Sequence, residues 1–225
     1  MAHQKVARYT ILNRFYFDAL KVLTDELNFN YVPNMVVGGT AYQLKMAELI
    51  AGKGGNLNSV SAGLEAFLRQ TGDIDLQLRA EEMDMIRIFN GMAASTSSLG
   101  IQNLPNRALH VTKGGNIVQV SYNTKPSDFR GMTEFYDHMI DTADEVVLKR
   151  GNTELRAHIP HLDYLLASKM IRMKEKDKVD ISNLLNVCKS KNLDLDSKFE
   201  STRRILKFLG KEDNFDYINQ TAYGC

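Results

Sequence analysis

Two aspartates, Asp73 and Asp75, stand two residues apart in the stretch RQTGDIDLQL (69–78). On a β-strand, residues two apart lie on the same face, about 6.5 to 7 Å apart at Cα, so their carboxylates can converge. Two close carboxylates disfavour each other's ionisation unless a cation is shared between them. Magnesium is the usual cation, because it binds a few carboxylates together with substrate phosphates. Spacing alone favours a simpler interpretation, which is a half-buried strand with solvated acids on one face.

A glycine pair, Gly38-Gly39, joins a short apolar run to a helical pattern in VVGGTAYQL (36–44). Glycines at such a turn let backbone amides approach an anion at the helix N-terminus. Thr40 could cap that helix or contact a phosphate. The pattern is neither a P-loop nor a Rossmann fingerprint. Taken alone, it is better explained as a tight turn between a strand and a helix.

A third group of charged residues lies in DYLLASKMIRMKEKDKVDISNLL (163–185). Lys169 follows two leucines in an apolar helical pattern, and its ammonium could neutralise triphosphate charge. Asp177 and Asp180 are three residues apart, so they share a helix face if both lie in the next helix. One of them could then orient a base or a metal. The alternative is a solvated basic face with Asp177 as a helix N-cap, and alone the charge density favours it.

The periodicity of the first half predicts helices and strands in alternation. Apolar residues recur at three- and four-residue steps from residue 8 to about 28, which indicates an amphipathic helix. Glycine and asparagine content indicates a loop over 52–59. The remaining elements expected there are a strand at 34–39, a helix at 40–51, a short helix at 60–68, a strand at 73–79 and a helix at 80–94.

The second half begins with hairpins and ends with helices. Strand patterns flank Gly114-Gly115 over 107–122, and a second hairpin over 144–159 turns at Gly151-Asn152. Beyond Pro160 the patterns predict three helices, at 161–176, 177–190 and 196–210. The expected fold class is therefore α/β, with a mixed, partly antiparallel sheet. We expect an α/β domain with an N-terminal helix over 1–158 and a helical segment over 159–225 packed on it.

The composition suits a soluble globular chain. Its 225 residues are 44% apolar and 24% charged, and the formal net charge of +1 gives no overall attraction to nucleic acid or lipid. Cys188 and Cys225 form no disulfide framework or metal clip, which favours a reduced, intracellular setting. The start MAHQKVARYT lacks an apolar run, so we expect no signal peptide, and no segment has the length of a membrane span.

In this order, the three motifs resemble those of nucleotidyltransferases of the DNA polymerase β-like superfamily, and most closely those of the abortive-infection, type IV toxin branch. That branch has a glycine strand-to-helix turn, an Arg-x-Ser/Thr-x-Asp-x-Asp strand and a helix with a leading Lys before Asp-x-x-Asp. The ordered combination is more specific than any single motif. The matching residues are Gly38, Gly39, Thr40, Arg69, Thr71, Asp73, Asp75, Lys169, Asp177 and Asp180.

The resemblance implies a nucleotidyltransferase-like fold and transfer of a nucleoside monophosphate from an NTP to a hydroxyl, with tRNA or a protein as acceptor. Asp73 and Asp75 would bind Mg²⁺ or Mn²⁺ and, with Lys169 and Asp177, form the catalytic set. Asp180 would be structural. A cytoplasmic toxin with a cognate antitoxin, and without a membrane partner, is the implied setting. The nucleotide-binding residues implied are Gly38, Gly39, Thr40, Arg69, Thr71 and Lys169.

The chain departs from the family pattern in two places. The connection between Gly39 and Asp73 is longer than usual, so 52–68 looks like an insertion that could act as a lid or bind the acceptor. A third acid is expected on the strand NIVQVSYN (116–123), where Gln119 and Ser121 take the inward positions instead. The alternative hypothesis follows from this absence: a nucleotide-binding regulatory relative that has lost catalysis. A purely structural α/β domain is the third, and it would require all three motifs to be coincidental.

Overall fold

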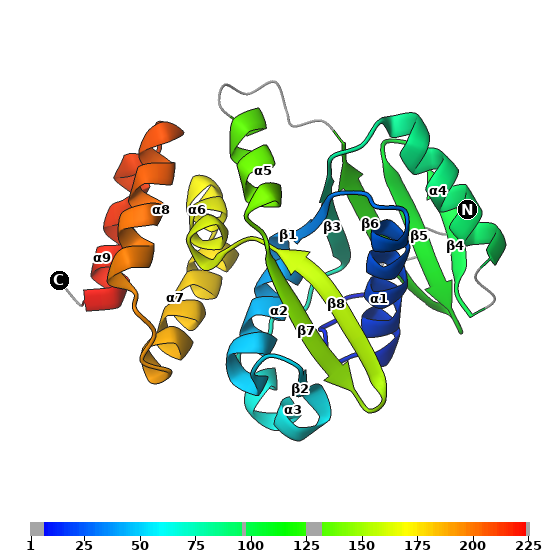
Figure 1. Cartoon of the computed structure of the whole chain (residues 1–225). Helices are drawn as coiled ribbons and strands as arrows, with labels where there is room; N and C mark the ends of the chain where they lie inside the picture. The colour runs from blue at the N-terminus through cyan, green and yellow to red at the C-terminus, as the bar shows by residue number, and fades with distance from the viewer. Residues whose placement is uncertain (1–6, 96–97, 125–131, 224–225) are drawn as a thin grey trace.

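The computed structural model describes residues 7–95, 98–124 and 132–223 (Figure 1). Its larger sheet has five strands in the order β1-β3-β6-β5-β4. The central pair, β3 (Asp73–Leu78) and β6 (Asn116–Asn123), is parallel, whereas the other neighbours are antiparallel. The outer strands are β1 (Asn34–Val37), β5 (Ala108–Lys113) and β4 (Gly100–Leu104). This mixed sheet confirms the α/β fold class expected from the sequence.

A smaller sheet is built on the second predicted hairpin. Strands β7 (Asp144–Arg150) and β8 (Thr153–Ile159) pair antiparallel, and Gly151 takes a positive φ of 59° at the turn. The two-residue strand β2 (Gly55–Asn56) adds to β7 in parallel. The first hairpin is equally regular, since Gly114 and Gly115 both have positive φ, as a primed turn requires.

Helices surround the two sheets in Figure 1, and the first of them begins at a side-chain cap. The side chain of Asn13 accepts a hydrogen bond from the backbone amide of Tyr16 and so begins α1. The helices of the first two thirds of the chain are α1 (Arg14–Phe29), α2 (Gly38–Ala51), α3 (Leu57–Glu65), α4 (Glu82–Ser95) and α5 (Met132–Asp141).

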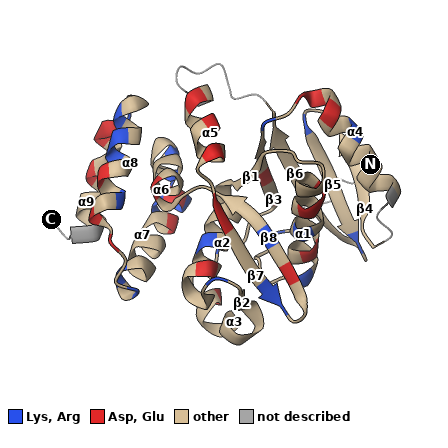
Figure 2. Cartoon of the chain, viewed as in Figure 1, with Lys and Arg blue, Asp and Glu red and all other residues tan. Residues whose placement is uncertain are grey.

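The C-terminal part is helical, and it lies together on one side of the molecule in Figure 1. It consists of α6 (Leu162–Arg172), α7 (Glu175–Ser190), α8 (Asp196–Phe208), the short 3-10 helix η1 (Glu212–Phe215) and α9 (Asp216–Tyr223). Figure 2 shows basic and acidic positions interspersed along α8, in keeping with the small net charge. None of the helices within the described ranges has both the length and the apolar character needed to cross a membrane.

One large hydrophobic cluster joins the sheets to the C-terminal helices. It includes Leu44 of α2, Ala157 of β8, Leu166 of α6 and Leu184 of α7, all of which are almost completely buried. Helix α2 contacts both α6 and α7. The element that carries the glycine turn is therefore packed directly against the helices that carry Lys169 and Asp177.

Several element boundaries differ from those expected. The first helix begins at Arg14 instead of residue 8, because Asn13 caps it and Tyr9 pairs with Thr71 through two backbone hydrogen bonds. The expected strand at 34–39 ends at Val37, and helix α2 already begins at Gly38. The expected loop at 52–59 contains β2 and the start of α3. Elements β4, α5, η1 and α9 were not predicted.

Candidate functional site

The glycine turn is built on an unusual backbone angle. Gly38 has a φ of +68°, and a Cβ placed there would lie 2.5 Å from Oδ2 of Asp75. A Cβ on Gly39 would lie 3.1 Å from the Arg69 guanidinium and 3.2 Å from the Thr71 hydroxyl. The turn therefore requires residues without side chains, because it packs against the polar groups of the neighbouring strand and loop.

Helix α2 begins within this turn, because Gly38 is its first residue. Val37 is its N-cap residue, and no side-chain hydrogen bond caps the helix there. The expectation that Thr40 could cap this helix is wrong, because the helix begins two residues earlier than predicted and places Thr40 inside the first turn. Backbone amides at an uncapped N-terminus can bind an anion.

Asp73 and Asp75 lie on the same face of β3, and both are partly buried. The parallel register places Asp73 opposite Gln119 of β6, and Asp75 opposite Ser121. This confirms the expected facing of the two strands, in which polar, uncharged side chains stand beside the acids. The Thr71 hydroxyl donates a hydrogen bond of 2.8 Å to Oδ1 of Asp73, which fixes the orientation of that carboxylate.

The environment of Asp75 disfavours its charged form. Burial raises the pKa of this carboxyl to about 6, and the nearby charge of Asp73 adds to the increase. The positive charges of Arg172, Lys176 and Lys169 oppose the increase. A cation bound beside Asp75 would therefore stabilise the ionised form of its carboxyl group.

The Thr40 side chain is occupied within the protein. Its hydroxyl lies 2.5 Å from the hydroxyl of Tyr16 and 3.2 Å from the backbone oxygen of Asp73. Tyr16, which is fully buried, also donates a hydrogen bond of 2.9 Å to the same oxygen. These contacts join α1, α2 and β3 at the start of the aspartate strand. The contact between Thr40 and a phosphate stays a prediction.

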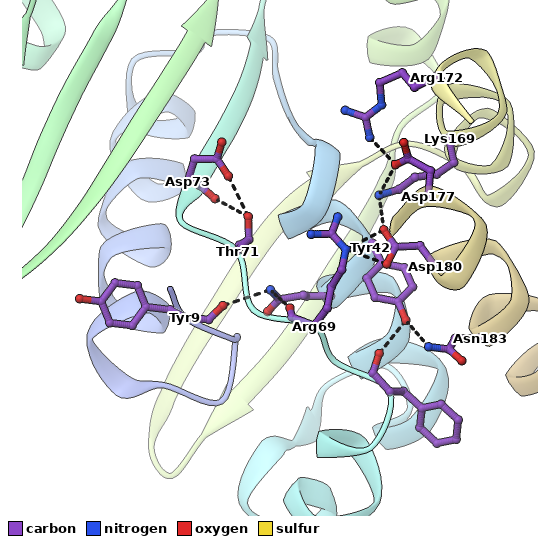
Figure 3. Close-up of polar contacts among 12 residues, drawn as sticks. Tyr9, Tyr42, Arg69, Thr71, Asp73, Lys169, Arg172, Asp177, Asp180 and Asn183 are labelled. Carbon is purple, nitrogen blue, oxygen red and sulfur yellow. Dashed lines mark hydrogen bonds and ion pairs between the residues drawn. The ribbon is translucent and has the colours of Figure 1, made fainter. Parts of the chain in front are cut away.

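A buried ionic cluster connects the loop before β3 to helices α6 and α7 (Figure 3). The ammonium of Lys169 donates to Oδ2 of Asp180 at 2.6 Å, and both side chains are essentially inaccessible. Nε of Arg69 lies 2.8 and 3.0 Å from the two oxygens of the same carboxylate. Lys169 also lies over the Tyr42 ring, 5.5 Å from its centre. Burial lowers the pKa of Lys169, although Asp180 counteracts this effect.

Asp177 lies beside this cluster, but its closest partner is Arg172. Nη2 of Arg172 is 2.7 Å from Oδ1 of Asp177, whereas Nζ of Lys169 is 3.7 Å away. The second oxygen of Asp177 is buried and has no hydrogen-bond partner. The alternative in which Asp177 caps the helix is wrong, because Lys174 is the N-cap residue of α7.

Two hollows lie along the edge formed by the two aspartates. A cavity of about 360 Å³ has Gly38, Asp75 and Arg172 in its lining, together with aromatic side chains of α5 such as Tyr136. A second hollow, of about 450 Å³, has a polar lining in which basic residues outnumber the single acid. Its charged residues are Arg8, Arg69, Asp73 and Lys176. The aspartate strand thus borders one partly aromatic cavity and one cationic hollow.

The donor set fits a magnesium or manganese ion. Asp73 and Asp75 offer carboxylate oxygens, which such ions prefer, and burial together with the charge of Asp73 raises the pKa of Asp75, so a bound cation would stabilise its ionised form. Within the described residues, no group of three or more His, Cys, Asp or Glu side chains could hold a metal. Mg²⁺ is commonly bound by one or two carboxylates together with substrate phosphates, so two protein ligands are enough.

The structure brings most of the predicted residues into one region. Gly38, Gly39, Arg69 and Thr71 surround the aspartates. The segment 52–68 is fixed to the body of the protein, because Gly54 bonds to the backbone of Val147 and the Tyr42 hydroxyl donates to the oxygen of Phe67.

Sequence reasoning did not identify Tyr16, Tyr42 or Tyr136 as residues of this region. Tyr16 falls in the apolar stripe of α1 and Tyr42 inside the buried helix α2. Their patterns predict burial and carry no signal for the hydroxyl at the end of the ring. Tyr136 belongs to α5, which was not predicted. Cys188 is a buried free thiol, and Cys225 lies outside the described residues.

The chain matches no protein-family model and no curated protein. Solved structures with partial similarity to this chain include the following two. The Megavirus polyadenylate synthase is 12% identical with a TM-score of 0.43, over 78% of this chain and 33% of that chain. The antibiotic-resistance factor ANT(2'')-Ia is 10% identical with a TM-score of 0.44, over 91% of this chain and 97% of that chain. Similarity at this level carries no inference about activity.

Proposed function

We propose that the protein is a metal-dependent nucleotidyltransferase that moves a nucleoside monophosphate from an NTP to a hydroxyl group. The observation that supports this most strongly is the contact between the glycine turn and the aspartate strand. Gly38, at the N-terminus of α2, leaves room for the Asp75 carboxylate, which a side chain at position 38 would displace. An anion-binding helix terminus and two metal-binding carboxylates therefore adjoin each other, as a triphosphate with its cation requires.

Most of the predicted residues have a role in this proposal. Asp73 and Asp75 hold Mg²⁺ or Mn²⁺, and Thr71 orients Asp73. The bound cation neutralises charge on the phosphates. The amides of Gly38 and Gly39 bind phosphate oxygens at the start of α2. The field of Lys169 and Arg69 offsets the negative charge of the substrate, although Asp180 already engages both cations.

The proposed reaction is an in-line displacement at the α-phosphorus. The acceptor oxygen forms a bond to this phosphorus while the bond to the oxygen that bridges to the β-phosphate breaks. Pyrophosphate leaves with the electron pair of that bond, and the hydroxyl proton passes to water in the cleft. Positioning and electrostatic stabilisation supply most of the rate enhancement in such reactions.

The finer parts of the proposal rest on the motif resemblance alone. They are a tRNA or protein acceptor, a role as the toxin of a toxin-antitoxin or phage-defence pair, a cognate antitoxin and a cytoplasmic location. The order of the glycine turn, the aspartate strand and the Lys169 segment supports them.

Label transfer tests the activity. The protein is incubated with each of four α-labelled NTPs, Mg²⁺ or Mn²⁺, and either total RNA or a protein lysate. We expect label on one class of macromolecule with the wild type and none with Asp73→Asn. Equal labelling by the wild type and Asp73→Asn would contradict the assignment of this strand as catalytic.

A catalytically silent nucleotide-binding relative is the second candidate, and the absence of a third acid favours it. Gln119 and Ser121 lie opposite the two aspartates, where a carboxylate could activate the acceptor. A thermal-shift screen with NTP and metal separates the candidates when combined with label transfer, because a ligand that binds only the folded state raises Tm. Stabilisation without transfer would support the silent relative, and no stabilisation by any NTP would oppose both candidates.

A further inference from the structure

Two basic side chains near the end of α6 differ in their exposure to solvent. The side chain of Lys169 is completely inaccessible, and its ammonium is already bonded to Asp180. The side chain of Arg172, one turn further along the helix, is 42% exposed. A cation can contact an incoming ligand only where solvent also reaches it. This difference separates a residue that holds the protein together from one that can meet a substrate.

Arg172 faces the candidate site. It lines the cavity of about 360 Å³ together with Gly38 and Asp75. Tyr136 lines the same cavity. The guanidinium therefore borders a cavity that has the proposed metal-binding residue Asp75 and an aromatic side chain in its lining.

The orientation of Arg172 is set by Asp177. The carboxylate of Asp177 is fully buried in the first turn of α7 and accepts from Nη2 of Arg172 at 2.7 Å. A guanidinium carries five N–H donors, so donors remain for a second anion. Paired donors in a fixed plane match the geometry of phosphate oxygens. The buried Asp177 carboxylate therefore holds the partly exposed guanidinium of Arg172 in one orientation.

We propose that Arg172 is the residue of this helical segment that contacts the phosphate chain of the nucleotide, and that Asp177 is the positioning residue that aims it. This inference rests on the proposed function and refines it. The motif resemblance assigned the phosphate contact to Lys169 and a catalytic role to Asp177. In the refined assignment, Lys169 and Asp180 fix α6 and α7 to Arg69, and neither contacts the substrate.

Binding measurements with two ligands test this assignment. The affinity for the preferred NTP with Mg²⁺, and for the corresponding nucleoside, is measured by equilibrium dialysis for the wild type and three arginine variants. Arg172→Gln should weaken NTP binding about 10- to 100-fold, the range for one charge-assisted hydrogen bond, and leave nucleoside binding unchanged. The NTP affinity of Arg172→Lys should lie between those of the wild type and Arg172→Gln, because lysine keeps the charge and loses the planar donors. Arg87→Gln on α4, whose arginine is 80% exposed and pairs with Asp84, is the matched control and should bind like the wild type.

The Asp177→Asn variant separates a positioning role from a catalytic one. If Asp177 aims Arg172, this variant should raise KM for the NTP severalfold with a smaller change in kcat, and it should have little further effect in the Arg172→Gln background. If Asp177 is instead a catalytic acid or base, kcat should collapse while NTP affinity stays the same. The second pattern would overturn the inference, as would wild-type NTP affinity in Arg172→Gln.

These failures differ from failure of the proposed function. A wild-type protein that binds no NTP would remove the proposed function and this inference together. A wild-type protein that binds NTP, with an Arg172→Gln variant that binds it equally well, would remove only the inference. Because Arg172→Gln removes the closest charged partner of the buried Asp177 carboxylate, we expect this variant to lose stability. Its nucleoside affinity shows in the same experiment that the binding site is still folded.

Discussion

Gly38 shows at the scale of single residues how the fold and the candidate site depend on each other. Its backbone occupies a region that L-residues rarely adopt, and the space beside it belongs to the Asp75 carboxylate. A side chain at this position would therefore cost stability and disturb the proposed metal site at once. Neighbouring Gly39 faces the Arg69 and Thr71 side chains at a slightly larger distance.

The first prediction concerns this glycine. Gly38→Ala should lower the free energy of unfolding by about 1–3 kcal/mol, because of the positive φ and the short approach to Asp75. Urea denaturation measures the change. The matched control is Gly63→Ala in α3, where a new Cβ meets nothing within 4 Å and alanine favours the helix. A Gly38→Ala variant as stable as the control would contradict the strain assigned to this turn.

The second prediction uses the pH dependence of Asp75. Its pKa is about 6 in the folded state, against 3.8 for the ordinary group, so the folded state binds more protons between these values. The contribution of Asp75 to stability is thus fully present below about pH 4 and is lost as the pH rises through about 6. Without metal, Asp75→Asn should be more stable than the wild type by about 1–3 kcal/mol near pH 7.5.

Chemical denaturation across this pH range is the measurement. The advantage of Asp75→Asn should disappear well below pH 3.8, the ordinary pKa of the group, where the wild-type carboxyl is protonated in both states. Asp84→Asn, which removes a carboxylate that is 55% exposed, is the control and should show no such gain near pH 7.5. A stability difference for Asp75→Asn that does not change with pH would contradict the assigned ionisation.

The sequence predicted individual residues well where a short-range rule applies. Strand alternation placed Asp73 and Asp75 on one face and brought Gln119 and Ser121 opposite them. It could not predict the partner of Arg69, because Asp180 is 111 residues away in the chain and reaches Arg69 only through packing of α7. The Tyr16 hydroxyl, which bonds to the backbone of Asp73, was missed for the same reason.

At the scale of elements, the ionic cluster of Arg69, Lys169 and Asp180 is the polar connection between two parts of the fold. Asp180 on α7 accepts hydrogen bonds from Lys169 of α6 and from Arg69 in the loop that leads into β3 (Figure 3). A buried charge is costly to leave alone, so the three groups hold the helices in one position against the aspartate strand. Their contribution is thus to geometry more than to net stability.

The third prediction is that Asp180→Asn lowers the free energy of unfolding by about 3–5 kcal/mol, because Lys169 then lacks its closest charged partner in a buried position. Guanidinium denaturation, monitored by circular dichroism, gives the value. The control is Glu200→Gln in the exposed pair with Arg204, which should change stability by at most about 0.5 kcal/mol. Equal effects of the two substitutions would contradict the cost assigned to a buried Lys169 that has lost its closest partner.

The predicted elements were most accurate where a turn or a cap marks the boundary. Both hairpins lie where their glycine turns indicated, and α6, α7 and α8 follow the helical periodicity. Strand β4 was missed because its residues are mostly exposed and lack alternation. The start of α1 was misplaced because residues 8–12 have a helical pattern but Tyr9 pairs with Thr71 instead.

At the scale of the whole molecule, the α/β portion and the C-terminal helices share the main hydrophobic cluster. Leu165 and Leu166 of α6 are completely buried in that cluster, together with residues of α2 and of β8. Removal of the helical segment would expose this surface and leave Arg69 without Asp180. The domain boundary near residue 158 stays a prediction, and it would mark a change of architecture more than a point where the chain can be cut.

The fourth prediction follows from this shared core. The full chain should unfold in a single cooperative transition, and a fragment of residues 1–158 should show no cooperative transition, because its apolar surface lacks a partner. Differential scanning calorimetry of both proteins is the measurement. Two separate transitions in the full chain, or a cooperative one in the fragment, would show that the portions are independent domains.

The aromatic wall of the cavity has a practical consequence for spectroscopy. The chain contains nine tyrosines and no tryptophan. Tyr136 lines the cavity that also contains Asp75 and Arg172, so Tyr136→Trp would place the only indole of the protein beside the candidate site. Its emission could be excited selectively at the red edge of the tyrosine absorption. The fold thus provides a position for a single intrinsic fluorophore that reports nucleotide entry in real time.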